Sequence, residues 1–258
     1  MFYCPLESIF ILAKGYGDRF NTVFVLRLYT KSNRLEPGMK VAVVIPSRGD
    51  RPEFMAQCLK MMQAQTRQAD HVIVVDYPPK DAIPDLVPRY REGFDKAFNL
   101  YKCDIAIAIE NDDYYSPEYI SFVVDAWDKA GRPQVFGLNR TIYYNVMTNK
   151  YVILSHPGRA SMMSMAVTPA IMFHKWCGDE YTYLDWHLWT QDKTLKKLSV
   201  PSPHLAIGIK HGKGLCGGGG HTTEWGHYNS TDKDWVFFDS IVKGEKDREF
   251  YRKINQQK

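Results

Sequence analysis

The stretch from Asp104 to Asp113 reads DIAIAIENDD, an apolar run that passes directly into a polar, acidic cluster. The sharp change in polarity predicts a buried strand that ends at the cluster. Two similar runs come earlier, at Val41–Ile45 and His71–Val75. Continuous runs of this kind are typical of strands buried on both faces, as in parallel sheets.

Helical stretches separate these three strands. Residues 52–66 carry apolar or small side chains at helical spacing, and Pro52 suits a first helical turn. A second helix is expected around residues 88–102, and a third after Ser116, a natural N-cap. The alternation predicts βαβ units with right-handed crossovers. We therefore expect an α/β fold, Rossmann-like, with a mainly parallel central sheet flanked by helices.

Polar residues follow each predicted strand at its carboxyl end. They are Ser47-Arg48, Asp76 and the cluster Glu110-Asn111-Asp112-Asp113. Ligands of such sheets bind outside the carboxyl ends of the strands, so the three sets are expected to meet in one crevice.

The acidic cluster is the candidate metal site. Mg²⁺ and Mn²⁺ prefer oxygen ligands and bind through one or two carboxylates together with substrate phosphates. Glu110 and Asp112 are two residues apart, so both could face one ion that bridges to a diphosphate. The alternative is a solvated acidic turn that caps the next helix.

The second half of the chain is less regular. The pattern over residues 134–156 predicts paired strands with a hairpin turn at Met147–Lys150. A helix is expected over residues 180–197. The segment His211–His227 is rich in glycine and histidine and has no periodicity. We expect one continuous domain over residues 1–258 rather than two.

The composition excludes several classes of protein. Of 258 residues, 45% are hydrophobic and 24% are charged, which allows a normal core without structural metals. A net charge of +4 fits an anionic substrate but is too small to indicate nucleic-acid binding. Five scattered cysteines without a CxxC pair indicate reduced thiols in a cytoplasmic protein. No apolar run approaches the ~20 residues of a membrane span, and no signal peptide is expected.

The order and spacing of the motifs over about residues 40–130 resemble those of GT-A glycosyltransferases, especially the large family-2-like group. That group has a strand followed by a Pro-Ser/Thr turn, here Val43–Arg48. Its next strand ends in one or two aspartates, here Asp76. Its third strand ends in an Asp-x-Asp motif and an aromatic, proline-containing stretch, here Glu110–Pro117.

The resemblance implies a metal-dependent enzyme that uses a nucleotide sugar, with a UDP-sugar as the expected donor. Asp112 would bind Mn²⁺ or Mg²⁺, with Glu110 in the place of the first motif aspartate. Asp76 would contact the uracil or ribose. The other residues expected to contact the donor are Pro46, Ser47, Arg48, Asn111 and Asp113.

Two departures from the family pattern affect this site. Tyr77 replaces the usual second aspartate after the second strand, which puts base recognition in doubt. Glu110 is longer than the expected aspartate, which leaves open whether it binds the metal directly or through water.

The family also places a base in an x-Glu-Asp type motif at the start of a later helix. Leu184–Trp189 reads LDWHLW and matches this pattern, with Asp185 in the base position. An attacking alcohol needs a proton acceptor within reach, and direct displacement with such a base predicts inversion, with retention as the alternative outcome. Asp179 and Glu180 are rivals, and a structural cap is the alternative role for Asp185.

The glycine-rich stretch and the helix before the third strand supply the remaining candidates. Four successive glycines at 217–220 leave backbone amides open to a phosphate. GT-A enzymes commonly close such a loop over the donor, and a histidine from it completes the metal shell. The candidates for that histidine are His211 and His221, with His227 third, while Lys210 or Lys213 would pair with phosphate. A flexible linker is the alternative. Related enzymes often keep a basic residue near the position of Arg91, although a solvated helix face also explains it.

The predicted function is transfer of a hexosyl or pentosyl group to an acceptor hydroxyl. Residues of about 40–130 would form the nucleotide-sugar half, and about 131–258 a smaller mixed acceptor-side half with the C-terminal loop. The acceptor would be a glycan or lipopolysaccharide, or, less favoured, a hydroxymethylated base in phage DNA. Two alternatives remain open: a nucleotidyltransferase that makes activated sugars, and a non-catalytic binding domain.

Overall fold

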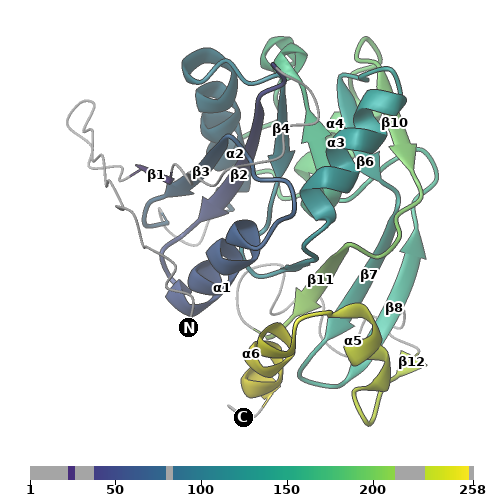
Figure 1. The fold of residues 1–258 in the computed structure, drawn as a ribbon. Helices are drawn as coiled ribbons and strands as arrows, with labels where there is room; N and C mark the ends of the chain where they lie inside the picture. The colour runs from purple at the N-terminus through teal and green to yellow at the C-terminus, as the bar shows by residue number, and fades with distance from the viewer. Residues whose placement is uncertain (1–22, 27–37, 80–83, 213–229, 256–258) are drawn as a thin grey trace.

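The computed structural model describes residues 23–26, 38–79, 84–212 and 230–255, and in these it forms two β-sheets (Figure 1). The larger sheet has the strand order β1-β3-β2-β4-β9-β6-β10. Its strands are β1 (Val23–Leu26), β2 (Val41–Ser47), β3 (His71–Asp76), β4 (Ile105–Ala108), β6 (Val135–Leu138), β9 (Met165–Val167) and β10 (Lys197–Val200).

The larger sheet is mainly parallel. β2 is parallel to both β3 and β4, and β10 is parallel to β6. β9 is antiparallel to both β4 and β6, so β6 runs in the same direction as β4. Only β1 and β9 of this sheet run the opposite way. The predicted α/β class with a mainly parallel central sheet is confirmed.

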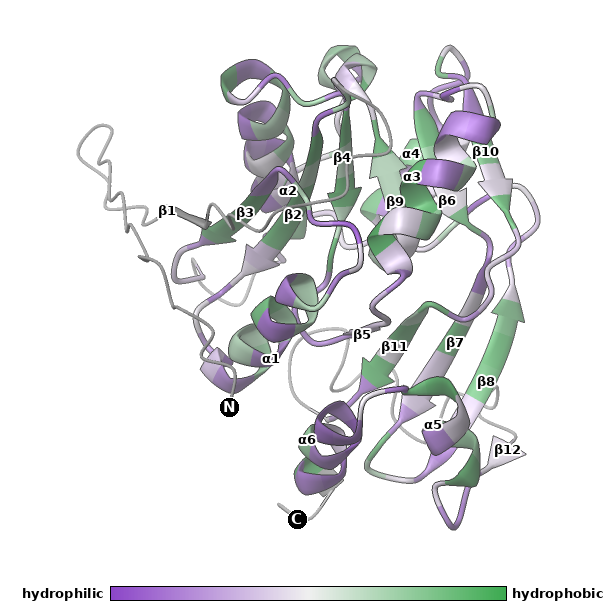
Figure 2. Ribbon diagram, in the orientation of Figure 1, coloured by the Kyte–Doolittle hydropathy of each residue, from purple (hydrophilic) through white to green (hydrophobic). Residues whose placement is uncertain are grey.

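Helices cover both faces of the larger sheet. α1 (Pro52–Gln63) and α3 (Tyr119–Lys129) pack against Val41 and its neighbours on one face. α2 (Leu86–Asp95) and α4 (Leu184–Thr190) pack against Ala42 and its neighbours on the other. Successive strand residues point to opposite faces, which explains why the central strands are apolar throughout (Figure 2).

Two predicted helices differ in extent from the observed ones. α3 begins at Tyr119, because the carbonyl of Ser116 accepts the Tyr119 N–H before the helix starts. The helix predicted over residues 180–197 ends at Thr190. The carboxylate of Asp192 accepts the backbone N–H of Thr194 at 2.7 Å, which turns the chain toward β10.

The smaller sheet is mixed and has the order β12-β8-β7-β11-β5. β7 (Arg140–Asn145) and β8 (Lys150–Ser155) form the predicted hairpin. β11 (Ala206–Lys210) is parallel to β7 and antiparallel to β5 (Tyr114–Tyr115). β5 directly follows the acidic cluster and β11 ends at Lys210, so this sheet brings two distant segments together. The remaining elements are β12 (Ser230–Thr231), a π-helical turn (Lys96–Leu100) and two 3₁₀ turns (Met162–Ser164 and Pro169–Phe173).

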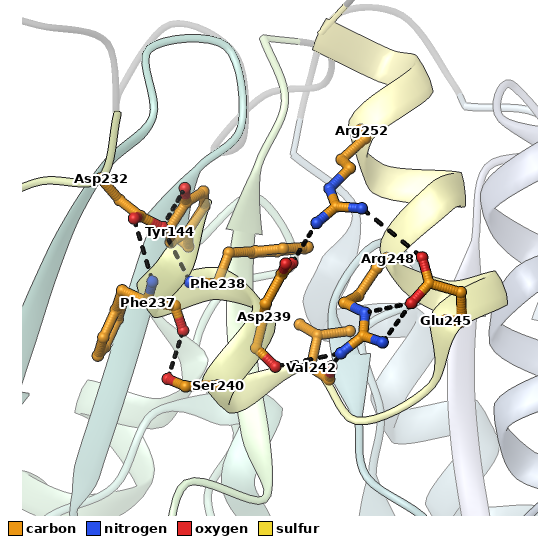
Figure 3. A network of polar contacts seen from close by, with 10 residues as sticks. All are labelled: Tyr144, Asp232, Phe237, Phe238, Asp239, Ser240, Val242, Glu245, Arg248 and Arg252. Atoms are coloured by element: carbon orange, nitrogen blue, oxygen red, sulfur yellow. Dashed lines mark hydrogen bonds and ion pairs between the residues drawn. The ribbon is translucent and has the colours of Figure 1, made fainter. Parts of the chain in front are cut away.

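Two C-terminal helices, α5 (Val236–Ile241) and α6 (Glu245–Asn255), close the smaller sheet (Figure 3). Asp232 accepts hydrogen bonds from the Tyr144 hydroxyl at 2.9 Å and from the Phe238 N–H at 2.8 Å. Arg252 of α6 pairs with Asp239 of α5. The network fixes α6 against the sheet, and α6 in turn reaches the acidic cluster.

Two sequence expectations concern the chain as a whole. Cys58, Cys103 and Cys177 are free thiols. Over the ranges given above, no helix combines the length and the apolar character that crossing a membrane requires.

Candidate functional site

A pocket opens at the carboxyl ends of β2 and β4. It brings together Ser47-Arg48 and the residues 110–112 of the acidic cluster, as the sequence predicts. The residues that line it are Pro46, Ser47, Arg48, Asp50, Arg51, Pro84, Asp85, Leu86, Arg89, Glu110, Asn111, Asp112, Thr182 and Lys210.

Asp76 lies beside this pocket rather than in its lining. It pairs with Ser47 across β2 and β3, and its Oδ1 atom is buried without a hydrogen-bond partner in the described part of the chain. Gly49 approaches it closely: its φ is +71°, and a Cβ there would lie 3.4 Å from Asp76 Oδ1. A glycine is therefore favoured at this turn by its backbone conformation.

Three buried tyrosines hold the backbone of the acidic loop, residues 109–113. They come from α2, β5 and α6, which belong to different parts of the fold. Their hydroxyls bond to the carbonyl of Ile109 (Tyr90, 3.3 Å), the N–H of Glu110 (Tyr115, 2.9 Å) and the carbonyl of Asp113 (Tyr251, 3.0 Å). The loop is thus fixed by tertiary contacts on several sides.

Three carboxylates of this loop fit a divalent cation. Glu110, Asp112 and Asp113 each offer an oxygen, and these oxygens all lie within 4.8 Å of one another. Asp113 Oδ1 accepts the Ile209 N–H at 2.8 Å, whereas its Oδ2 is buried and receives no hydrogen bond from a described residue. Hard cations bind oxygen sets of this kind.

Two cationic or polar side chains already contact Asp112. Arg51 pairs with Asp112 Oδ2, and His211 Nε2 lies 3.0 Å from the same oxygen. The His211 ring is buried against Phe54, with 4.3 Å between the ring centroids. His211, expected from the sequence near the metal, therefore does lie at Asp112.

In the acidic cluster, the effect of burial on each pKa is opposed by neighbouring groups of opposite charge. Burial raises the pKa of Asp113, and the charge of Glu110 adds to that effect while Lys210 opposes it. Burial alone would raise the pKa of Asp112, but the hydrogen bond from His211 and the charge of Arg51 hold it well below its usual range. Burial would lower the pKa of Lys210, yet the carboxylates of Asp113 and Glu110 raise it. Lys210 therefore stays charged beside the pocket.

Arg89 is a pocket residue that the sequence reasoning missed. Its side chain is buried, donates a hydrogen bond to the Ser47 carbonyl and pairs with Asp85. Its guanidinium carbon lies 3.6 Å from the Tyr77 ring centroid. The spacing of Asp85 and Arg89 by four residues was the available signal for a helical ion pair.

Arg91, the basic residue expected near the donor, is not in the pocket lining. It pairs with Asp179 at 2.8 Å on the surface, with 38% of its side chain exposed. Two residues are about 200° of rotation around a helix, so Arg89 faces the sheet while Arg91 faces solvent.

Asp185 lies in the first turn of α4, near the pocket. Thr182, three residues earlier, lines the pocket. Burial raises the pKa of Glu110, and the charges of Asp112 and Asp185 add to that shift. Burial raises the pKa of Asp185 itself, and hydrogen bonding from the Trp186 backbone and the charge of Arg159 oppose that shift. Arg159 Nη1 lies 3.5 Å from Asp185 Oδ2. The rivals Asp179 and Glu180 are exposed.

Exposed aromatic side chains surround Asp185 in sequence. We call residues 173–186 the aromatic segment. Among the described residues, all of the exposed large aromatic side chains fall in it: Phe173 (92%), Tyr181 (38%), Tyr183 (60%) and Trp186 (47%). The segment also carries more carboxylates than cations, with Asp179, Glu180 and Asp185 against Lys175.

Lys213, His221 and His227 lie outside the described residues, so the expectations for them and for the glycine-rich stretch remain predictions.

Comparisons with known proteins give weak likenesses only. No protein-family model and no curated protein sequence matches the chain. Among solved structures, A197 from STIV matches with a TM-score of 0.42 and 9% identity, over 64% of this chain and 83% of that chain. S. aureus TarS 1-349 matches with a TM-score of 0.45 and 9% identity, over 67% of this chain and 61% of that chain. The same TarS fragment in complex with UDP matches with a TM-score of 0.42 and 12% identity, over 64% and 62% of the two chains. Such values carry no argument about function, which rests on the site itself.

Proposed function

We propose that the chain is a metal-dependent glycosyltransferase of the GT-A type that takes a UDP-sugar as donor. The observation that carries the proposal is the set of three carboxylates at the end of β4, on the edge of a pocket that basic residues also line. Acidic and basic groups side by side suit a metal–diphosphate pair better than either alone.

Glu110, Asp112 and Asp113 are the residues that would hold Mn²⁺ or Mg²⁺. The ion would supply positive charge to the diphosphate of the donor as that group leaves. His211 lies next to Asp112 and is the described histidine that would complete the metal shell.

Basic residues on the other walls of the pocket would bind the nucleotide. Arg48 and Lys210 line the pocket, and Arg89 fixes the Ser47 carbonyl at its base. Asp76 would contact the uracil or ribose from beside Gly49, where its Oδ1 atom is buried and receives no hydrogen bond from a described residue.

Asp185 would act as the base. It would accept the proton of the acceptor hydroxyl while the hydroxyl oxygen bonds to the anomeric carbon and the bond to the UDP oxygen breaks. Attack from the face opposite the leaving group inverts the anomeric centre. The raised pKa of Asp185 supports this role, because a base is more effective when its pKa is closer to the working pH.

The aromatic segment favours a glycan over DNA as the acceptor. Its exposed rings offer apolar faces to sugar rings, and its excess of carboxylates would repel a phosphate backbone. The free thiols fit a cytoplasmic location, which is part of the proposal.

A donor screen tests the proposed function. Purified chain with Mn²⁺ is incubated with a panel of UDP-sugars, and release of UDP is measured with and without EDTA. We expect slow, EDTA-sensitive hydrolysis of at least one UDP-sugar. A nucleotidyltransferase would instead release pyrophosphate from UTP and a sugar 1-phosphate, and a non-catalytic domain would show neither reaction.

A further inference from the structure

Arg51 occupies a position where a metal ion would have to compete with it. It is the residue just before α1, and its guanidinium reaches across the pocket to the acidic cluster. One nitrogen pairs with Asp112 Oδ2, and another lies 3.3 Å from Asn111 Oδ1. The side chain is 15% exposed, so the contact is largely shielded from water.

A divalent ion that binds Asp112 Oδ2 would disturb the contacts that this oxygen already makes. Asp112 Oδ2 already contacts both Arg51 and His211, and Arg51 Nη1 lies 3.3 Å from His211 Nε2. A divalent cation on the same oxygen would be repelled by the guanidinium at close range. Binding of the ion through Asp112 Oδ2 therefore requires that the guanidinium move away.

The pocket offers the displaced guanidinium a new partner when a donor is bound. A guanidinium matches phosphate oxygens with two parallel hydrogen bonds, and Arg51 lines the same pocket as Arg48 and Lys210. The other neighbours of the guanidinium make only weak contacts with it. Asp50 Oδ1 lies 3.6 Å from Arg51 Nε, and the Phe54 ring centroid lies 5.9 Å from Arg51 Cζ.

We infer that Arg51 is a donor-binding residue that also competes with the divalent ion for Asp112. In the ligand-free protein it neutralises Asp112, and when metal and donor bind together it leaves Asp112 and pairs with the diphosphate. The inference rests on the proposed function, because it takes the acidic cluster as the metal site and a nucleoside diphosphate as the ligand.

The test compares two affinities of the full chain in wild type, Arg51→Gln and Arg132→Gln. Arg132 is the matched control, since it is 56% exposed, pairs with Asp128 and lies outside the pocket lining. Mn²⁺ affinity without nucleotide is measured from the electron paramagnetic resonance signal of free Mn²⁺. We expect Arg51→Gln to bind Mn²⁺ about tenfold more tightly than wild type, which corresponds to about 1.4 kcal/mol.

UDP affinity at saturating Mn²⁺ is then measured by calorimetry. We expect Arg51→Gln to bind UDP about tenfold more weakly, again about 1.4 kcal/mol, and Arg132→Gln to match wild type in both measurements. Arg51→Lys keeps the positive charge but loses the paired N–H donors of the guanidinium. It should change both affinities in the same directions as Arg51→Gln, by a smaller factor. Opposite changes in the two affinities are diagnostic, because a damaged fold would lower both.

Unchanged or weaker Mn²⁺ binding by Arg51→Gln or Arg51→Lys, in a variant with a normal unfolding curve, overturns the competition. Unchanged UDP binding overturns the phosphate contact. If wild type and all variants fail to bind Mn²⁺, the metal part of the proposed function is wrong and this inference falls with it. Equal Mn²⁺ and UDP affinities in all four proteins overturn the inference alone.

Discussion

The acidic loop and the aromatic segment flank the same pocket but are built in opposite ways. The acidic loop is held by three tyrosine hydroxyls from three elements, and Asp113 is fully buried. The aromatic segment presents four large rings to solvent. The Trp186 ring centroid lies 5.5 Å from the guanidinium carbon of Arg159. One region is a charge-dense loop fixed from several sides, and the other exposes aromatic rings among carboxylates.

This contrast fits a division of work between the two regions. A metal–diphosphate site depends on geometry held to a fraction of an ångström, which calls for a loop fixed from several sides. A surface that receives varied or extended acceptors needs exposed contact area instead. Changes to the loop should therefore affect stability and chemistry, whereas changes to the exposed rings of the aromatic segment should affect acceptor binding.

The largest expected effect comes from the carboxylate where the two regions meet. Asp185→Asn should leave UDP affinity unchanged and lower sugar transfer by roughly 10²–10⁴-fold, because general-base catalysis contributes about that factor. The assay is transfer to an acceptor at saturating donor, with calorimetry of UDP binding in parallel. Asp179→Asn, an exposed rival on the same segment, is the control and should transfer normally. Normal transfer by Asp185→Asn would refute the base assignment.

The next effect tests the rigidity of the acidic loop. Tyr251→Phe removes the hydroxyl that donates to the Asp113 carbonyl and leaves that buried carbonyl unpaired. We expect the free energy of unfolding to fall by about 1–3 kcal/mol, measured in urea, and metal affinity to fall as well. Tyr101→Phe, at a half-buried tyrosine stacked on His71 away from the pocket lining, is the control. If Tyr251→Phe is as stable and binds metal as well as the wild type, the tyrosine does not hold the loop.

A smaller effect is expected on the aromatic segment. Trp186→Ala should raise the KM for a glycan acceptor by about tenfold, a loss of about 1.4 kcal/mol, with the unfolding midpoint and UDP affinity unchanged. The control is Leu100→Ala, which truncates a 64% exposed side chain on the π-helical turn and should alter none of these quantities. An unchanged KM in Trp186→Ala, or a lowered unfolding midpoint, would mean that the ring packs rather than binds.

The smallest effect is a shift in pH dependence. Burial raises the pKa of Asp185, and the positive charge of Arg159 partly counters it. A base must be ionised, so activity is lost as the pH falls through this pKa. Arg159→Gln removes the countering charge, raises the pKa further and should move the acid limb of kcat/KM to higher pH. Arg140→Gln, an exposed arginine on β7, should leave the limb in place. A shift to lower pH would contradict the assigned electrostatics.

The same contrast explains what could be predicted from the sequence. The central strands are apolar on both faces, so their runs and their polar ends are local signals, and these predicted the sheet and the gathering of Ser47, Arg48 and the acidic cluster. The hairpin of β7 and β8 was equally local. Asp185 was matched through a short motif, and its role as the base stays a prediction.

The contacts that fix the site are long-range and left no such signal. Arg51 meets Asp112 across 61 residues, and Tyr251 meets Asp113 across 138. Arg91 was named as a donor residue and Arg89 was not considered, because the sequence alone did not show which of the two arginines faces the sheet. The overlong helix after residue 180 arose because an Asp192 turn closes it through side-chain hydrogen bonds rather than through glycine or proline.

The most direct test of the central claim is calorimetry of UDP binding with and without Mn²⁺, in wild type and in Asp112→Asn. Wild type is expected to bind UDP at least about tenfold more tightly with Mn²⁺ than without it, a difference of about 1.4 kcal/mol. Asp112→Asn is expected to lose that difference. UDP binding that is independent of Mn²⁺ in the wild type, or no UDP binding at all, would contradict the account.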